Sequence, residues 1–165
     1  MGVLNDLTVF MQMLCRPLSV NFRQPLTGAL VWLAACLVSG QALAQAGDRV
    51  RTLGHIPGDA LAALYGGAEA FCFPSRFEGF GIPLVEAMAS GCPVISSSAS
   101  CMPEIVGTAG LLVDPDDVPA WTDALGRLAK DPDALASYRQ RGLIRAKDFS
   151  WTQSAAVVWK ALQPC

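Results

Sequence analysis

From residue 50 onward, short apolar segments alternate with segments of helical pattern, and glycine, proline or aspartate separates them. The expected strands lie at residues 50–54, 70–74, 93–97 and 110–113, and the expected helices at 60–65, 83–90, 102–106, 117–130, 132–149 and 151–162. Strands that alternate with helices favour a parallel sheet with helices on both of its faces. We therefore predict an α/β fold with a Rossmann-like parallel sheet, in which ligands bind at the carboxyl ends of the strands.

Capping residues and glycines predict where these helices begin and end. Asp59, Asp131 and Ser150 have side chains that can cap a helix N-terminus. The glycine pair at residues 66–67 is expected to end the first helix. Gly142 is expected to loosen the long helix that contains it.

Length and charge exclude several classes of protein. A chain of 165 residues, of which 52% are hydrophobic and 16% charged, suits one domain with a real core. A net charge of -2 gives no basic surface for nucleic acid. The six cysteines include no C-x-x-C pair, and one histidine is too few for a Cys/His zinc site. Reduced thiols in a cytoplasmic protein are the simplest interpretation, and we expect no metal.

The first 47 residues differ from the rest, because only Asp6, Arg16 and Arg23 are charged there. Three interpretations of the uncharged run compete: a membrane-spanning helix over residues 26–44, a signal peptide cleaved near residues 42–44, and a buried strand with its adjoining helix. We favour the buried strand. We accordingly divide the chain into a hydrophobic N-terminal segment, residues 1–47, which would be the incomplete start of the domain, and a main domain, residues 48–165.

The loop at residues 75–82 carries the most chemical information. It contains Glu78 and the Gly79-Phe80-Gly81 sequence, and Glu86 follows in the first turns of the next helix. Small residues let a ligand approach the backbone, and the N–H groups at a helix start can hold phosphate oxygens. The two carboxylates can accept hydrogen bonds from ribose and sugar hydroxyls. Together these features describe a nucleotide-sugar site, although each alone also fits an ordinary turn or a favourable helix-dipole charge.

Longer motifs support the same interpretation. The segment from Glu78 to Glu86 reads EGFGIPLVE and is followed by AMASGCPV; PEIVGTAGLLVDPDD stands at residues 103–117 and DFSW at residues 148–151. In this order the motifs resemble the retaining glycosyltransferases of family 4, which have the GT-B fold and an E-x7-E motif. The resemblance runs from residue 48 to about residue 162. It implies that the chain is equivalent to the C-terminal, donor-binding half of a GT-B enzyme.

The resemblance also implies roles for individual residues. Glu86 would bind the ribose of the donor, and Glu78, the catalytic candidate, would contact the transferred sugar. Backbone amides of Phe80, Gly81 and Ile82 would meet the sugar and the diphosphate. The remaining candidates for donor binding are Gly79, His55 and Ile56, of which the last two would lie near the base.

The reaction implied is transfer of a hexose, with mannose as the suggested sugar, from a nucleotide diphosphate sugar to an acceptor hydroxyl with retention. The donor would be a GDP- or UDP-sugar, the acceptor a carbohydrate or a lipid-linked molecule, and no metal or cofactor would be needed. The Asp114-Pro-Asp116 sequence is interpreted as a turn rather than as a metal-binding motif. A cytoplasmic enzyme is expected, with attachment to the inner face of the membrane left open.

This chain departs from the family in two respects. It has no room for the acceptor-binding N-terminal domain, which would be a separate partner, and it shows no clear counterpart of the upstream Arg and Lys that hold the diphosphate. Two alternatives therefore stay open. The chain could be a non-catalytic nucleotide-sugar-binding fragment that needs a separate acceptor domain, or a fragment anchored in a membrane through residues 26–44.

Overall fold

The computed structural model describes residues 13–15, 53 and 56–163. In this part of the chain, one sheet has four strands in the order β1 (Met13–Cys15), β2 (Ala68–Phe73), β3 (Val94–Ser97) and β4 (Gly110–Val113). β2, β3 and β4 are parallel, which confirms the predicted parallel sheet, and β1 pairs antiparallel with β2 at the edge. β1 was not among the predicted strands.

Some predictions lie outside the described residues. They concern the uncharged run at residues 26–44, the division of the chain at residues 47 and 48, and His55. The predicted strand at residues 50–54 also falls there, apart from Leu53, which is in neither a helix nor a strand.

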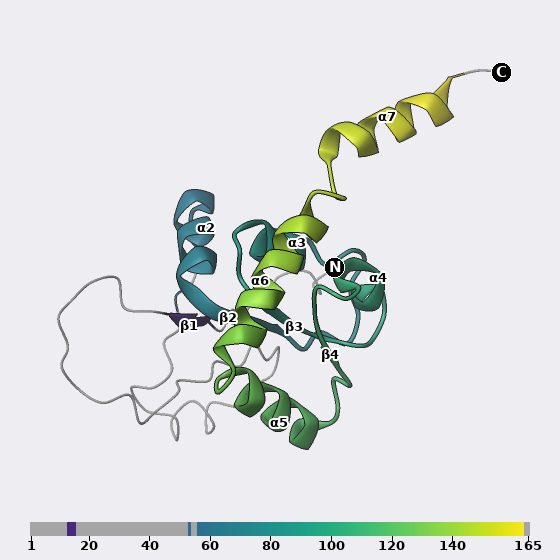
Figure 1. Ribbon diagram of the computed structural model, residues 1–165. Helices are drawn as coiled ribbons and strands as arrows, with labels where there is room; N and C mark the ends of the chain where they lie inside the picture. Colours follow the sequence, from purple (N-terminus) through teal and green to yellow (C-terminus); the bar gives the residue numbers. More distant parts are fainter. Residues whose placement is uncertain (1–12, 16–52, 54–55, 164–165) are drawn as a thin grey trace.

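Helices connect the parallel strands and cover the sheet (Figure 1). They are α2 (Gly58–Gly67), α3 (Ile82–Ala89), α4 (Met102–Val106), α5 (Val118–Leu128), α6 (Pro132–Ala146) and α7 (Trp151–Leu162). α3 joins β2 to β3, and α4 joins β3 to β4. The loops at the carboxyl ends of β2 and β3 therefore lie next to each other, because the two strands are parallel neighbours.

The core has two layers because successive side chains of a strand point to opposite faces. Phe71 and Phe73 of β2 belong to a cluster with buried residues of α2, α3 and α4. Ala70 and Cys72 belong to a second cluster with the buried face of α5. Both faces of the sheet are covered, as a mostly hydrophobic parallel strand requires.

Two of the expected capping residues are confirmed. The side chains of Asp131 and Ser150 precede α6 and α7 and accept hydrogen bonds from Ala134 N (2.9 Å) and Gln153 N (3.4 Å). Asp117 caps α5 in the same way, through Ala120 N at 2.9 Å.

Other predicted boundaries were wrong or only partly right. Asp59 does not cap α2: Pro57 holds the N-cap position, which leaves Asp59 in the first turn. α2 ends at the glycine pair as predicted, but both glycines are still helical, so its last residue is Gly67 rather than Tyr65. α6 passes through Gly142 without interruption, and Gly142 lies against α3, where Met88 Cγ is 3.4 Å from the position of an added Cβ. α6 then ends at Ala146, three residues earlier than predicted.

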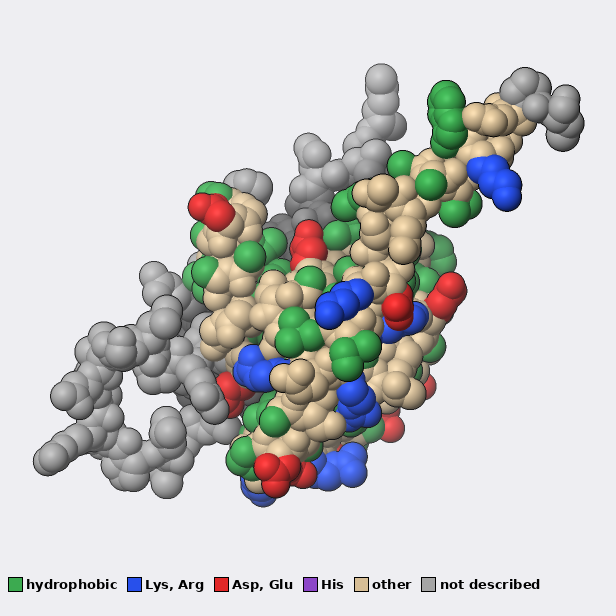
Figure 2. All heavy atoms as spheres, turned by 45° about the horizontal axis from the view of Figure 1, so that its top comes forward, with side chains coloured by type: hydrophobic (Ala, Val, Ile, Leu, Met, Phe, Trp, Pro, Cys, Tyr) green, Lys and Arg blue, Asp and Glu red, His purple; other side chains and the backbone are tan. Residues whose placement is uncertain are grey.

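α7 projects away from the rest of the described chain (Figure 1), and none of its residues is buried. Figure 2 shows apolar side chains along this projecting helix, and Trp159 is 68% exposed. Within the described ranges, no helix combines the length and the apolar character that crossing a membrane needs.

Candidate functional site

The candidate site is built around the loop that joins β2 to α3, at the carboxyl end of a parallel strand. Gly81 stands at the N-cap of α3 with φ +87°, a left-handed conformation that favours glycine. The helix begins at Ile82, and Pro83 occupies its first turn, where the missing N–H costs no helical hydrogen bond. Among the described residues no side chain caps this helix start. Its N–H groups and dipole are thus suited to an anion.

Glu78 is half-buried and is held at both its side chain and its backbone. Ser75 Oγ donates a hydrogen bond to Glu78 Oε1 at 2.9 Å. The backbone carbonyl of Glu78 accepts from Ser100 Oγ at 2.9 Å and from Cys101 Sγ at 3.2 Å. Since Ser100 and Cys101 lie between β3 and α4, the loop after the neighbouring strand fixes the position of the first motif glutamate.

Glu86 lies on α3, one turn after the helix start, and is exposed. No hydrogen bond or ion pair engages its carboxylate within the part of the chain that is described. Burial and, second, the negative charge of Glu86 raise the pKa of Tyr65 on α2. The exposed carboxylate of Glu86 is therefore available to accept hydrogen bonds from a ligand's hydroxyls.

The remaining loop candidates surround the helix start. An added Cβ at Gly79 would meet no atom within 4 Å, so the backbone there is open to a ligand. Phe80 and Ile82 are each 45% exposed. Ile56 directly precedes the N-cap of α2, and no hydrogen bond joins it to the loop among the described residues. The structure thus brings Glu78, Gly79, Phe80, Gly81, Ile82 and Glu86 together at the start of α3.

A metal ion has no evident site here: within the residues that the structure describes, no group of three His, Cys, Asp or Glu side chains could hold one. Asp114 and Asp116 form the predicted turn, with Asp116 N donating to Asp114 Oδ1 at 2.9 Å. The Asp116 carboxylate also pairs with Arg76, whose Nε donates to it at 2.9 Å. Arg76 thereby brings a cation to the loop, which the sequence analysis did not single out.

The sequence analysis also missed the residues that support the loop. They are Ser75, Ser97, Ser100, Cys101, Arg145 and Phe149. Ser97 Oγ donates to the Ser75 carbonyl from the end of β3. The run of small polar residues after the predicted strand at 93–97 was the available signal, because the carboxyl ends of adjacent parallel strands meet at one edge of the sheet.

Comparison with known proteins finds similarity to glycosyltransferases. The family described as Glycosyl transferases group 1 matches residues 31–131. O-antigen chain mannosyltransferase B of Escherichia coli is 43% identical over 102 residues, which cover 62% of this chain and 27% of that protein. MMP alpha-(1->4)-mannosyltransferase of Mycolicibacterium hassiacum is 44% identical over 123 residues, which cover 70% of this chain and 30% of that protein.

D-inositol 3-phosphate glycosyltransferase of Corynebacterium kroppenstedtii is 39% identical over 108 residues, covering 64% of this chain and 24% of that protein. Among solved structures, a sucrose-phosphate synthase from Thermosynechococcus elongatus matches with a TM-score of 0.67 at 33% identity, over 74% of this chain and 33% of that one. This likeness confirms the predicted Rossmann-like α/β class. The chain spans less than a third of the length of the three curated relatives.

Proposed function

Since the chain belongs to the family Glycosyl transferases group 1, we propose that it is the donor-binding half of a retaining hexosyltransferase that uses a nucleotide diphosphate sugar. The observation that carries the proposal is the arrangement around the start of α3. A half-buried glutamate, a Gly-Phe-Gly loop and an exposed glutamate, Glu86, converge on one helix N-terminus. The Rossmann-like fold places this helix N-terminus at the carboxyl edge of the sheet, where such folds bind nucleotides.

The proposed donor lies with its diphosphate at the start of α3. The backbone N–H groups of Phe80, Gly81 and Ile82 donate to the phosphate and sugar oxygens, and the helix dipole favours the negative charge. Glu86 accepts hydrogen bonds from the ribose hydroxyls, and Glu78 accepts from hydroxyls of the transferred sugar. His55 and Ile56 are proposed to lie near the base.

In the proposed reaction, the bond between the anomeric carbon and the diphosphate oxygen breaks, and its electron pair leaves with the diphosphate. The acceptor hydroxyl oxygen bonds to the same carbon on the same face, and its proton is released. The transition state resembles an oxocarbenium ion, as in glycoside hydrolysis. Negative charge grows on the leaving diphosphate, so fixed N–H donors at the helix start stabilise the transition state more than the bound donor.

Mannose is the proposed sugar because two of the similar proteins are named mannosyltransferases. GDP or UDP is the proposed nucleotide, and a carbohydrate or lipid-linked hydroxyl the proposed acceptor. The acceptor site is proposed to lie on a separate N-terminal GT-B domain, because this chain spans 24% to 30% of the length of those relatives. We place the proposed reaction in the cytoplasm.

A second candidate function, in which the chain binds a nucleotide sugar without transferring it, is favoured by the lack of a clear counterpart of the upstream Arg and Lys that would hold the diphosphate. Both candidates predict donor binding, and they differ in turnover once an acceptor domain is supplied. Adding the separately expressed N-terminal half of a similar mannosyltransferase, with GDP-mannose and its acceptor, discriminates them. Product formation above that of the N-terminal half alone supports the transferase, and its absence despite donor binding supports the binding module.

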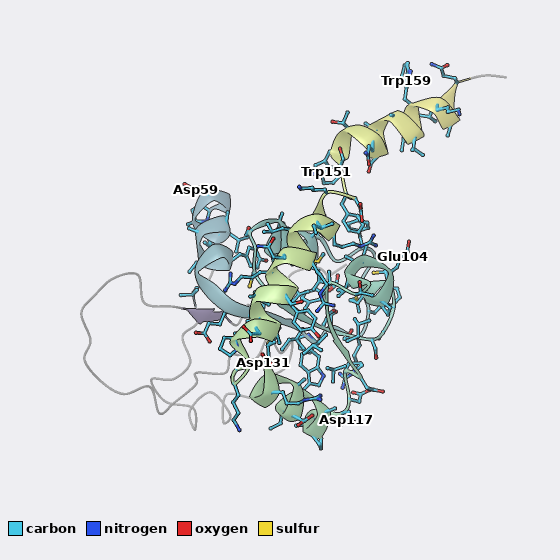
Figure 3. All side chains as sticks on the ribbon, viewed as in Figure 1. Asp59, Glu104, Asp117, Asp131, Trp151 and Trp159 are labelled. Atoms are coloured by element: carbon cyan, nitrogen blue, oxygen red, sulfur yellow. The ribbon has the colours of Figure 1, made fainter. Side chains whose placement is uncertain are left out.

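Calorimetric titration of the chain with GDP, UDP and ADP tests donor binding, which both candidate functions require. We expect metal-independent binding of at least one nucleotide and its loss in Glu86→Gln. Asp133→Asn is a matched control, because it also neutralises an exposed helical carboxylate, next to Asp131 at the start of α6 (Figure 3). Failure of the unaltered chain to bind any of the three nucleotides, or equal effects of the two substitutions, would contradict the proposal.

A further inference from the structure

The ring of Phe80, at the centre of the Gly-Phe-Gly loop, packs edge-to-face against Phe149. The ring centroids are 5.7 Å apart and the ring planes are inclined at 87°. Phe149 lies between α6 and α7, far from the loop in sequence. An edge-to-face pair sets the direction of a ring as well as its distance, since the positive edge of one ring meets the negative face of the other.

Phe149 is itself held in place by contacts with α6 and, through Arg145, with α4. The guanidinium of Arg145 lies over the Phe149 ring, 4.8 Å from its centroid. That guanidinium donates hydrogen bonds to the backbone carbonyls of Glu104 (2.6 Å) and Ile105 (3.1 Å) on α4, and Figure 3 labels Glu104 on this helix. Phe149 N also donates to the Ala146 carbonyl at 3.2 Å. The ring is thus fixed to α6 and, through Arg145, to α4.

The loop needs such an external support because glycine stands on both sides of Phe80. Gly79 has open space around its Cα, and Gly81 adopts the left-handed conformation. Glycine samples more backbone conformations than any other residue, so a Gly-Phe-Gly segment without its ring contact would lose much conformational entropy on binding a ligand. A loop already held in one conformation avoids that cost.

We propose that Phe149 is a positioning residue for the donor site: through the Phe80 ring it holds the backbone amides of Phe80, Gly81 and Ile82 in the conformation that binds the diphosphate. This role rests on the proposed function, because it concerns the same site. Phe149 does not touch the donor. Its effect on binding passes through Phe80.

A double-mutant cycle in the full chain tests whether Phe149 acts on donor binding through Phe80. The affinity for GDP, UDP and ADP is measured by calorimetry. Phe149→Ala is expected to weaken the affinity for the bound nucleotide about fivefold, the size of one edge-to-face pair. In a Phe80→Ala background the same substitution is expected to have no further effect on affinity. Phe149→Tyr, which keeps the ring, is expected to restore affinity. A merely structural role for Phe149 would weaken binding equally in both backgrounds and would overturn the proposal.

Two controls keep the outcomes distinct. Trp151→Ala removes an 82% exposed aromatic side chain two residues further on and is expected to leave affinity unchanged. Phe149→Leu replaces Phe149→Ala if the alanine variant does not fold, as judged by thermal unfolding. If the unaltered chain binds a nucleotide and neither variant weakens it, only the role of Phe149 fails. If the unaltered chain binds none of the three, the proposed function fails and the role of Phe149 with it.

Discussion

The hydroxyl of Ser100 makes two hydrogen bonds to the backbone of Glu78: it donates to the carbonyl at 2.9 Å and accepts from the N–H at 3.4 Å. Among the described residues, Ser100 is the one non-glycine residue with a positive φ, +52°. Such a conformation costs about 1–3 kcal/mol and persists where the surroundings enforce it, often at functional sites. The strained residue of the β3–α4 loop thus holds the glutamate proposed to contact the transferred sugar.

The strain at Ser100 gives the first prediction. Ser100→Ala and Ser100→Gly both remove the hydroxyl, but glycine adopts a positive φ without a steric penalty. We expect Ser100→Ala to lower the free energy of unfolding by about 1 kcal/mol more than Ser100→Gly does. Urea denaturation of the two variants measures the difference. Equal stabilities would show that the backbone at Ser100 is not strained in solution.

The second prediction concerns pH. Burial raises the pKa of the Cys72 thiol to about 12, so the folded chain keeps a proton that the unfolded chain releases as pH rises above about 9. This contribution to stability is complete below pH 9 and is lost progressively between pH 9 and 12. We expect the free energy of unfolding to fall between pH 8 and 10 by a smaller amount in Cys72→Ala than in the unaltered chain. Parallel pH profiles of the two proteins would contradict the buried-thiol explanation.

Local signals in the sequence predicted much of the fold. Asp131 and Ser150 were identified as helix starts because their side chains cap backbone N–H groups only three residues away. The E-x7-E spacing likewise predicted that Glu78 and Glu86 lie at one helix start, since a short loop and one helical turn separate them. The wrong prediction for the start of α2 also has a local cause. Pro57 can occupy the N-cap as well as Asp59, and the sequence pattern did not decide between the two.

The residues that support the site could not be predicted in this way. The contacts of Ser100 with Glu78 and of Phe149 with Phe80 depend on which strands and helices are neighbours in space. The pairing of β1 with β2, with Met13 opposite Phe71, likewise joins segments that are far apart in the sequence. Single-sequence patterns report periodicity and capping, whereas such long-range contacts follow from how the elements pack.

The third prediction tests a contact that joins α6 to the sheet. Arg139 donates to the carbonyls of Gly91 (2.6 Å, from Nη1) and Ala68 (3.0 Å, from Nη2), one just before β3 and the other at the start of β2. We expect Arg139→Ala to lower the free energy of unfolding by about 2 kcal/mol, as for hydrogen bonds to a charged group, and Arg139→Lys to recover only part of it. Denaturant unfolding measures both losses.

Arg127→Ala provides the control for Arg139. Arg127 pairs with Asp123 at 3.0 Å on the exposed face of α5, where an ion pair contributes about 0.5 kcal/mol or less. A loss for Arg139→Ala as small as that for Arg127→Ala would mean that the two carbonyl contacts do not stabilise the junction of α6 with the sheet.

The last prediction contrasts two glycines. Gly110 of β4 lies opposite Val94 of β3, and a Cβ added there would come within 2.5 Å of Val94 Cγ2 and of the Val94 carbonyl oxygen. Because backbone cannot yield as a side-chain end does, Gly110→Ala is expected to lower the free energy of unfolding by about 2–3 kcal/mol or more. Gly126 of α5 has no atom within 4 Å of an added Cβ, so Gly126→Ala is expected to raise it by about 0.5–1 kcal/mol. Thermal and urea unfolding of both variants checks the opposite signs, and destabilisation by Gly126→Ala together with tolerance of Gly110→Ala would contradict the packing of β3 against β4 described above.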